Sequence, residues 1–200
     1  MEALKDRVAI VTGASRGIGL AIAQALASQG CNLILTGRDE KALAKVSREL
    51  ALTKIKTLAH SCDVRDPQSI DALFRAVRQK FNRLDILINN AGIAHPNFTV
   101  AKLPAELWKD VIDTNLTGMF LITQAALPMM QSGGTIVNNL SIVANPGATD
   151  TEIWNTFWPQ APRKKMMSAA TIAEAVVHAI QLPQNATVET LEILPTIGLL

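Results

Sequence analysis

The stretch Val8-Ala9-Ile10-Val11-Thr12-Gly13-Ala14-Ser15-Arg16-Gly17-Ile18-Gly19 decides the fold expected for this chain. Its first four residues are apolar and mostly β-branched, which predicts a short buried strand. Three glycines follow at the spacing Gly-x-x-x-Gly-x-Gly, and an unbroken run from Leu20 to Ala27 predicts a helix that Gly30 ends. This order gathers backbone N–H groups at the positive end of a helix dipole, where proteins bind phosphate. A tight turn without a ligand is the alternative, but the position between strand and helix favours a nucleotide site.

The composition is that of a folded globular protein. The chain has 200 residues, of which 48% are hydrophobic and 18% are charged, and this predicts one domain over residues 1–200. A net charge of +2, with Lys and Arg scattered along the chain, indicates no nucleic-acid partner. No apolar run reaches the ~20 residues of a membrane span, and residues 1–7 lack the apolar core of a signal peptide. We therefore expect a cytoplasmic protein with no membrane partner.

The two cysteines, Cys31 and Cys62, do not have the spacing of a metal site. We interpret them as buried, reduced thiols. His60 and His178 also lack a ligand partner at metal spacing, so no metal is expected.

Apolar strands alternate with amphipathic helices along the chain. Further strands are predicted at residues 32–36, 55–59, 84–88 and 135–140, and helices at 39–50, 67–81 and 105–130. The pair Gly133-Gly134 is expected to end the last of these helices. The alternation predicts an α/β fold with a doubly wound, parallel, Rossmann-type sheet. Ligands bind such sheets at the carboxyl ends of the strands.

The end of the second strand indicates which dinucleotide the site prefers. An acidic residue about 20 residues after the glycines holds the ribose 2′-OH of NAD. Here the strand ends in Gly37 and Arg38, with Arg16 in the glycine loop nearby. A guanidinium pairs with a 2′-phosphate, whereas a carboxylate repels it, so we predict NADP(H) rather than NAD. The alternative is two solvated arginines. Asp63, after the third strand, either accepts from the adenine amino group or caps the following turn.

Several motifs resemble the short-chain dehydrogenase/reductase family in order and spacing. They are Thr12 to Gly19, Asp63-Val64, Asn89-Asn90-Ala91-Gly92 and Asn115, and the resemblance covers residues 5 to 141. It resumes after residue 146 with Pro146-Gly147-Ala148-Thr149-Asp150-Thr151, a helix around 172–177 and a strand over 188–194.

The resemblance implies a role for each matching residue. Ser141 would bind the substrate carbonyl, and Asn115 would kink the long helix and hold a water in the proton relay. The implied reaction is hydride transfer between NADPH and a small-molecule carbonyl or alcohol. The implied cofactor-binding residues are Gly13, Ser15, Arg16, Gly17, Ile18, Gly19, Arg38, Asp63, Val64, Asn89, Ala91, Gly92, Pro146, Gly147 and Thr151. Residues 152–168 correspond to the family's substrate lid, although an apolar core patch is an equal alternative.

The pattern breaks after Ser141. The family's proton donor is a tyrosine with a lysine four residues later, and this chain has no tyrosine. Only four residues separate Ser141 from Pro146, while a parallel crossover needs a dozen or more. We therefore expect that the catalytic helix and one strand are missing after the fifth strand.

Three expectations follow from this break. The enzyme would be impaired, because acid–base assistance of roughly 100- to 10,000-fold is lost. The alternative is a catalytically inactive NADP-binding module. The apolar face of the 105–130 helix would also lose its neighbour, which alters the interface of an expected homo-oligomer.

Overall fold

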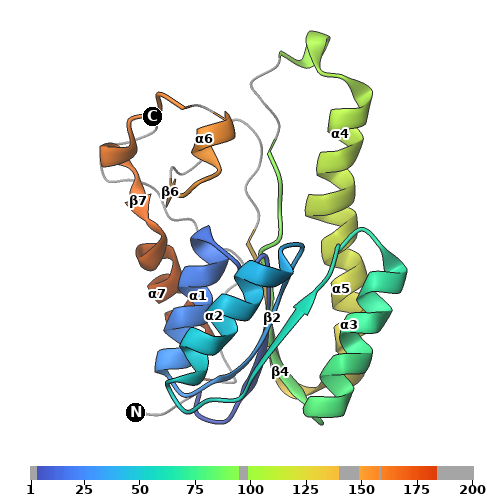
Figure 1. The fold of residues 1–200 in the computed structure, drawn as a ribbon, viewed down its shortest axis with the longest axis vertical. Helices are drawn as coiled ribbons and strands as arrows, with labels where there is room; N and C mark the ends of the chain where they lie inside the picture. Colours follow the sequence, from blue (N-terminus) through green and yellow to red (C-terminus); the bar gives the residue numbers. More distant parts are fainter. Residues whose placement is uncertain (1–3, 95–98, 140–148, 158, 184–200) are drawn as a thin grey trace.

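The computed structural model describes residues 4–94, 99–139, 149–157 and 159–183. Its main sheet has five parallel strands in the order β3-β2-β1-β4-β5 (Figure 1). The strands are β1 (Val8–Thr12), β2 (Asn32–Gly37), β3 (Thr57–Ser61), β4 (Leu84–Asn89) and β5 (Met130–Asn138). The chain starts at the centre of the sheet and winds outward in both directions, which confirms the predicted doubly wound, single-domain α/β fold. The strand predicted at 188–194 lies outside the described residues.

Helices cover both faces of this sheet. On one side lie α1 (Gly17–Ser28), α2 (Glu40–Ala51) and α7 (Ala169–Ile180), and on the other lie α3 (Pro67–Lys80) and α5 (Gly118–Ala126) (Figure 1). Successive residues of β1 alternate between the two hydrophobic cores: Ala9 and Val11 pack in the first, and Val8 and Ile10 in the second. A strand that is buried on both faces of the sheet is apolar on both faces, and this explains the apolar run from Val8 to Val11.

Local signals fix several helix ends. Gly30 adopts φ +76° just after α1, in the left-handed region that glycine enters without strain. The Asp39 carboxylate accepts from the backbone nitrogen of Ala42 at 3.0 Å and caps α2. Pro67 occupies the first turn of α3, as predicted.

The long helix predicted over 105–130 is confirmed as far as Met129, and it consists of four helical segments that follow one another without a gap. They are α4 (Ala105–Ile112), a π-helix (Asp113–Thr117), α5 and a 3₁₀ turn (Leu127–Met129). The π-helix contains Asn115, whose side chain binds the backbone of the neighbouring loop. Such single-turn π segments within α-helices are frequent at functional sites.

The role predicted for the pair Gly133-Gly134 as a helix stop is wrong, because the helix ends earlier, at Met129. Strand β5 already begins at Met130, paired with Leu84, and the pairing resumes at Ile86 with Thr135 after a register shift. Gly133 lies within this irregularity at φ +85°. The glycine therefore permits a bulge in the strand, because the backbone there enters a region unfavourable to other residues.

The interval after β5 is short. Residues 139–148 separate β5 from the two-residue strand β6 (Thr149–Asp150), which pairs with β7 (Met167–Ser168) and not with the main sheet. A crossover to a further parallel strand needs a dozen or more residues. The missing helix and strand stay a prediction, because residues 140–148 lie outside the described residues.

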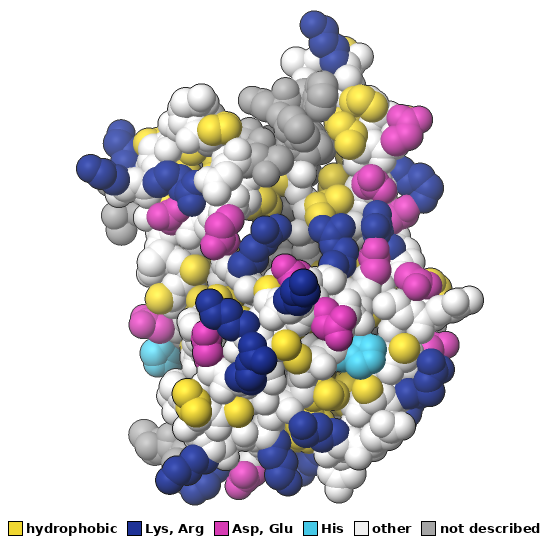
Figure 2. Space-filling view, viewed as in Figure 1, with side chains coloured by type: hydrophobic (Ala, Val, Ile, Leu, Met, Phe, Trp, Pro, Cys, Tyr) yellow, Lys and Arg dark blue, Asp and Glu magenta, His cyan; other side chains and the backbone are white. Residues whose placement is uncertain are grey.

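Three apolar side chains stay exposed along the segment after α4. Leu116, Phe120 and Leu127 are 54%, 60% and 53% exposed and recur at helical spacing. We call these three residues the exposed stripe. On the molecular face in Figure 2, Lys and Arg side chains are interspersed with Asp and Glu, so no single sign of charge dominates it. Within the described residues, no helix is long and apolar enough to cross a membrane.

Candidate functional site

The glycine loop between β1 and α1 has a backbone that only glycine adopts easily. Gly13 and Gly17 have φ values of +65° and +57°. A Cβ on Gly19 would overlap the Gly13 carbonyl oxygen and the Asn90 side-chain nitrogen. The loop is therefore closely packed on its inner side. The N-terminus of α1 follows at once and leaves backbone N–H groups for an anion.

Thr12 and Asn90 tie this loop to the end of β4. The Thr12 hydroxyl accepts from the backbone nitrogens of Asn90 and Ala91, each at 2.9 Å. The Asn90 Nδ2 donates to the Thr12 carbonyl at 3.0 Å and to the Gly13 carbonyl at 3.4 Å. These bonds join two strand ends that are 78 residues apart in sequence. The family resemblance implies no role for Thr12 or Asn90, although both stand in the quoted motifs.

A second asparagine pair extends the connection to β5. Asn139 donates through Nδ2 to the Asn90 side-chain oxygen at 2.9 Å. Asn89 donates to the side-chain oxygens of Thr123 and Asn138 at 3.0 and 2.9 Å. The buried Oδ1 of Asn89 has no hydrogen-bond partner within the described part of the chain. Polar side chains thus link the carboxyl ends of three neighbouring strands.

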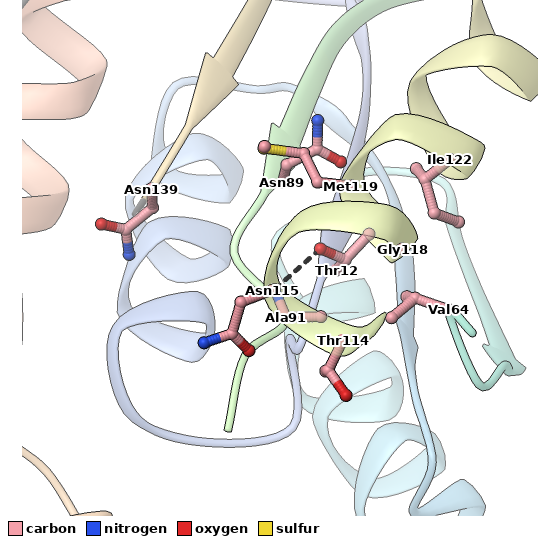
Figure 3. A pocket seen from close by; sticks show the side chains of 10 residues that line it. All are labelled: Thr12, Val64, Asn89, Ala91, Thr114, Asn115, Gly118, Met119, Ile122 and Asn139. Atoms are coloured by element: carbon pink, nitrogen blue, oxygen red, sulfur yellow. Dashed lines mark hydrogen bonds between the residues drawn. The ribbon is translucent and has the colours of Figure 1, made fainter. Parts of the chain in front are cut away.

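Asn115 reaches the segment after β4 from the π-helix. Its Oδ1 accepts from the backbone nitrogen of Ile93 at 2.8 Å, and its Nδ2 donates to the Ile93 carbonyl at 2.9 Å. Figure 3 shows the small cavity beside it, which measures about 10 Å³, room for about one water. Ten residues line this cavity: Thr12, Val64, Asn89, Ala91, Thr114, Asn115, Gly118, Met119, Ile122 and Asn139.

The end of β2 is open. A Cβ on Gly37 would find only the Gly13 Cα, at 3.9 Å. Arg38 and Arg16 are both exposed, and Arg16 occupies the capping position before α1. Arg38 is close enough for its charge to contribute to a lowered pKa at Asp63. The site therefore has space and positive charge where the sequence predicts a phosphorylated ribose.

Asp63 interacts mainly with Arg65. Its Oδ1 accepts from the Arg65 backbone nitrogen at 3.0 Å, and its Oδ2 accepts from Arg65 Nη2 at 2.7 Å. The hydrogen bond from the Arg65 side chain is the main reason that the pKa of Asp63 lies below its ordinary value. Asp63 thus caps the following turn, one of its two predicted roles. The next residue, Val64, packs closely on Gly118. A Cβ atom added to Gly118 would lie 2.6 Å from Val64 Cγ2.

The remaining predicted site residues divide into two groups. Thr151 lies beside the glycine loop, since its Cβ and Cγ2 are each 3.4 Å from a Cβ placed on Gly17. Ser141, Pro146 and Gly147 lie outside the described residues. No cluster of metal-ligating side chains occurs among the residues that are described. Cys31 and Cys62 are free and buried, as predicted.

Comparison with known proteins agrees with this geometry. The family model described as short chain dehydrogenase matches residues 7–157. The chain belongs to the short-chain dehydrogenase family. An uncharacterized oxidoreductase of Staphylococcus saprophyticus is 32% identical over 237 aligned positions, which include 98% of this chain and 100% of that protein.

Two solved structures resemble the chain over most of its length. An alcohol dehydrogenase from the archaeon Thermococcus sibiricus, complexed with 5-hydroxy-NADP, is 26% identical, with a TM-score of 0.85 over 96% of this chain and 97% of that one. A variant actinorhodin polyketide ketoreductase with NADPH is 27% identical, with a TM-score of 0.74 over 91% and 93% of the two chains. Both were solved with a nicotinamide dinucleotide, and the glycine loop described above fits such a ligand.

The alignment with the oxidoreductase of Staphylococcus saprophyticus is longer than this chain. It has 237 positions and the chain has 200 residues, so at least 37 positions (237 less 200) hold a residue of the relative alone. A strand–helix–strand unit takes about 30 residues or more. The residues that the relative alone has are therefore as many as such a unit contains.

Proposed function

We propose that this chain binds NADP(H), that it descends from enzymes transferring hydride between NADPH and a carbonyl or alcohol carbon, and that its own catalysis is impaired. The observation that carries the proposal is the glycine loop, which Thr12 and Asn90 fix at the carboxyl edge of the sheet. Its backbone donors and the α1 N-terminus are suited to a diphosphate.

The preference for NADP(H) rests on the end of β2. Gly37 stands where NAD-binding sites have the acidic residue that holds the ribose 2′-OH. It has no side chain, and Arg38 follows it in sequence. A guanidinium forms charge-assisted, bidentate hydrogen bonds with a phosphate, so Arg38 and Arg16 would hold the ribose 2′-phosphate. Asp63 caps its own turn through Arg65, and the further lone pairs of its carboxylate would accept from the adenine amino group.

The cofactor supplies the hydride when it is bound, and the chain binds and orients it. The loop from Gly13 through Ser15, Gly17 and Ile18 to Gly19 would hold the diphosphate. Val64 would contact the adenine ring. Asn89, Ala91 and Gly92 would support the adenosine ribose, and Pro146, Gly147 and Thr151 would meet the nicotinamide.

The impairment rests on the absence of tyrosine from the sequence. Ser141 would still bind a substrate carbonyl, and Asn115 would hold a water beside the cavity that it lines. Neither residue is an acid that exchanges a proton near neutral pH, so hydride transfer would proceed without its usual proton donor.

Titration of the purified chain with NADPH, followed by turnover assays on a panel of ketones and aldehydes, tests the proposal. We expect saturable binding and a raised melting temperature, since a ligand that binds only the native state stabilises it. We expect little oxidation of NADPH. A melting temperature that NADPH leaves unchanged would overturn the proposal, and full turnover would overturn the impairment.

The missing tyrosine also supports a second candidate function, a catalytically inactive NADP-binding module. Tight NADPH binding without any turnover over the whole panel would favour this module. Measurable turnover that Ser141→Ala abolishes would exclude it.

We further propose a homo-oligomer in the cytoplasm. The exposed stripe supports association, because adjacent apolar side chains on a surface favour a partner. Two free, buried thiols are typical of a reducing compartment.

A further inference from the structure

Residues 149–157 and 159–168 form a small unit next to the glycine loop, and we call it the flap. It contains β6, the short helix α6 (Trp154–Phe157), a 3₁₀ turn (Arg163–Lys165) and β7, which leads directly into α7 (Figure 1). Trp154 is only 3% exposed and forms a cluster with Ala161 and Met166. The Trp154 indole donates to the Thr149 carbonyl at 2.8 Å. The flap therefore has an apolar core of its own.

One guanidinium joins the two halves of the flap. Arg163 donates through Nη2 to the Thr151 carbonyl at 2.7 Å and through Nη1 to Asn155 Oδ1 at 3.1 Å. Its Nε donates to the Asp150 carboxylate. These three acceptors lie in the β6–α6 segment, and Arg163 lies after it. The planar fork of arginine reaches three such acceptors at once, which the single ammonium of lysine does not.

The residue held by this guanidinium is also the one that meets the cofactor loop. The Thr151 side chain lies within 3.4 Å of the Cβ position on Gly17, and Glu152 Oε2 lies 4.0 Å from the same point. Gly17 starts α1, where the diphosphate of a dinucleotide would lie. A loosened Thr151 backbone would therefore move the side chain that lies against the loop proposed to hold the diphosphate.

We propose that Arg163 is a positioning residue, which holds Thr151 against the glycine loop and so fixes the flap for the nicotinamide half of the cofactor. This inference rests on the proposed NADP(H) function. It adds a residue that touches no cofactor and acts through Thr151. The adenosine end, at Arg38 and Asp63, lies on other strand ends and does not depend on it.

The test compares two ligands on the full chain by isothermal titration calorimetry. NADPH would reach both the adenosine end and the nicotinamide end of the proposed site, whereas adenosine 2′,5′-bisphosphate lacks the nicotinamide half. We expect Arg163→Lys to weaken NADPH by about 5- to 20-fold, as for the loss of one or two charge-assisted hydrogen bonds. Binding of the bisphosphate is expected to stay within about twofold. Lys165→Gln, which removes a neighbouring positive charge from the same turn, is expected to bind both ligands like the wild type.

The possible results distinguish a failure of the positioning role of Arg163 from a failure of the proposed NADP(H) binding. Equal weakening of both ligands, or NADPH binding unchanged in Arg163→Lys, would overturn the positioning role. A merely structural role would lower the melting temperature and weaken both ligands together, so thermal unfolding of each variant is measured as well. A wild-type chain that binds neither ligand would overturn the proposed function, and the positioning role with it.

Discussion

Asn90 donates two hydrogen bonds to Thr12, one from its backbone nitrogen and one from its side chain. The Asn90 backbone nitrogen donates to the Thr12 hydroxyl at 2.9 Å, and the Asn90 side chain donates to the Thr12 carbonyl at 3.0 Å. The first bond satisfies a backbone donor at the end of β4. The second holds the start of the glycine loop. The two strand ends of the proposed cofactor site are thus fixed to each other without a ligand.

Thr12→Val tests this connection with little change in volume. The valine leaves the backbone nitrogens of Asn90 and Ala91 without their acceptor. We expect a loss of about 1–3 kcal/mol in unfolding free energy, as for unsatisfied buried donors, and weaker NADPH binding. Urea unfolding and calorimetry measure the two effects. Thr36→Val is the control: this equally buried hydroxyl donates to the His60 carbonyl and lies outside the connection. Similar loss of NADPH affinity in both variants would contradict the argument.

Arg38→Ala tests the choice between NADPH and NADH. The guanidinium is expected to pair with the 2′-phosphate, which NADH lacks, so the variant should bind NADPH roughly 10- to 100-fold more weakly. Its affinity for NADH should change by less than about twofold. Lys41→Ala removes a nearby exposed charge on α2 and controls for the general field. Equal loss for both dinucleotides would refute phosphate pairing.

The exposed stripe is expected to drive self-association. Phe120→Ser combined with Leu127→Ser removes two of its three side chains, and we expect a smaller assembly at a given protein concentration. Sedimentation velocity over a concentration series measures this. Leu52→Ser is the control, because Leu52 is 84% exposed but lies at the end of α2. Assembly that is the same in the stripe variant and the wild type would show that another surface is responsible.

Cys31 is expected to make stability fall at alkaline pH. Burial, the main cause, raises the pKa of its thiol to about 12. The pKa of the Cys31 thiol is higher in the folded chain than in the unfolded chain. The protonated thiol therefore stabilises the fold in full below the unfolded pKa, and this stabilisation is lost as the pH rises from there toward the folded pKa. The unfolded chain ionises from about pH 8.5, so the loss continues from there toward pH 12.

Urea unfolding at pH 7 and pH 10 checks this prediction. The wild type should lose roughly 1–2 kcal/mol more than Cys31→Ala over this interval, since one pKa unit corresponds to about 1.36 kcal/mol. The thiol should also resist alkylation until the chain unfolds. Rapid alkylation of Cys31 in the native protein would contradict the burial.

The local structure of the glycine loop could be predicted from the sequence, because it depends on residues that are close to one another along the chain. The strand, glycine turn and helix over residues 8–28 form as predicted, since apolar run, positive-φ glycines and helix cap are all local signals. The start of β5 was not predictable in this way. Met130 joins the sheet because β4 offers it a partner at Leu84, and such pairing overrides a helical pattern in the sequence.

The sequence by itself determined the doubly wound fold, the family and the glycine loop, and it also determined that no tyrosine is present to donate a proton. These are matters of residue type and spacing along the chain. Only the tertiary structure decided which polar groups meet: Thr12 with Asn90, Asn115 with Ile93, and Arg163 with Thr151. The physical reason is directional. A hydrogen bond requires both partners within about 3 Å at a suitable angle, and that is set by the folded backbone rather than by spacing in sequence.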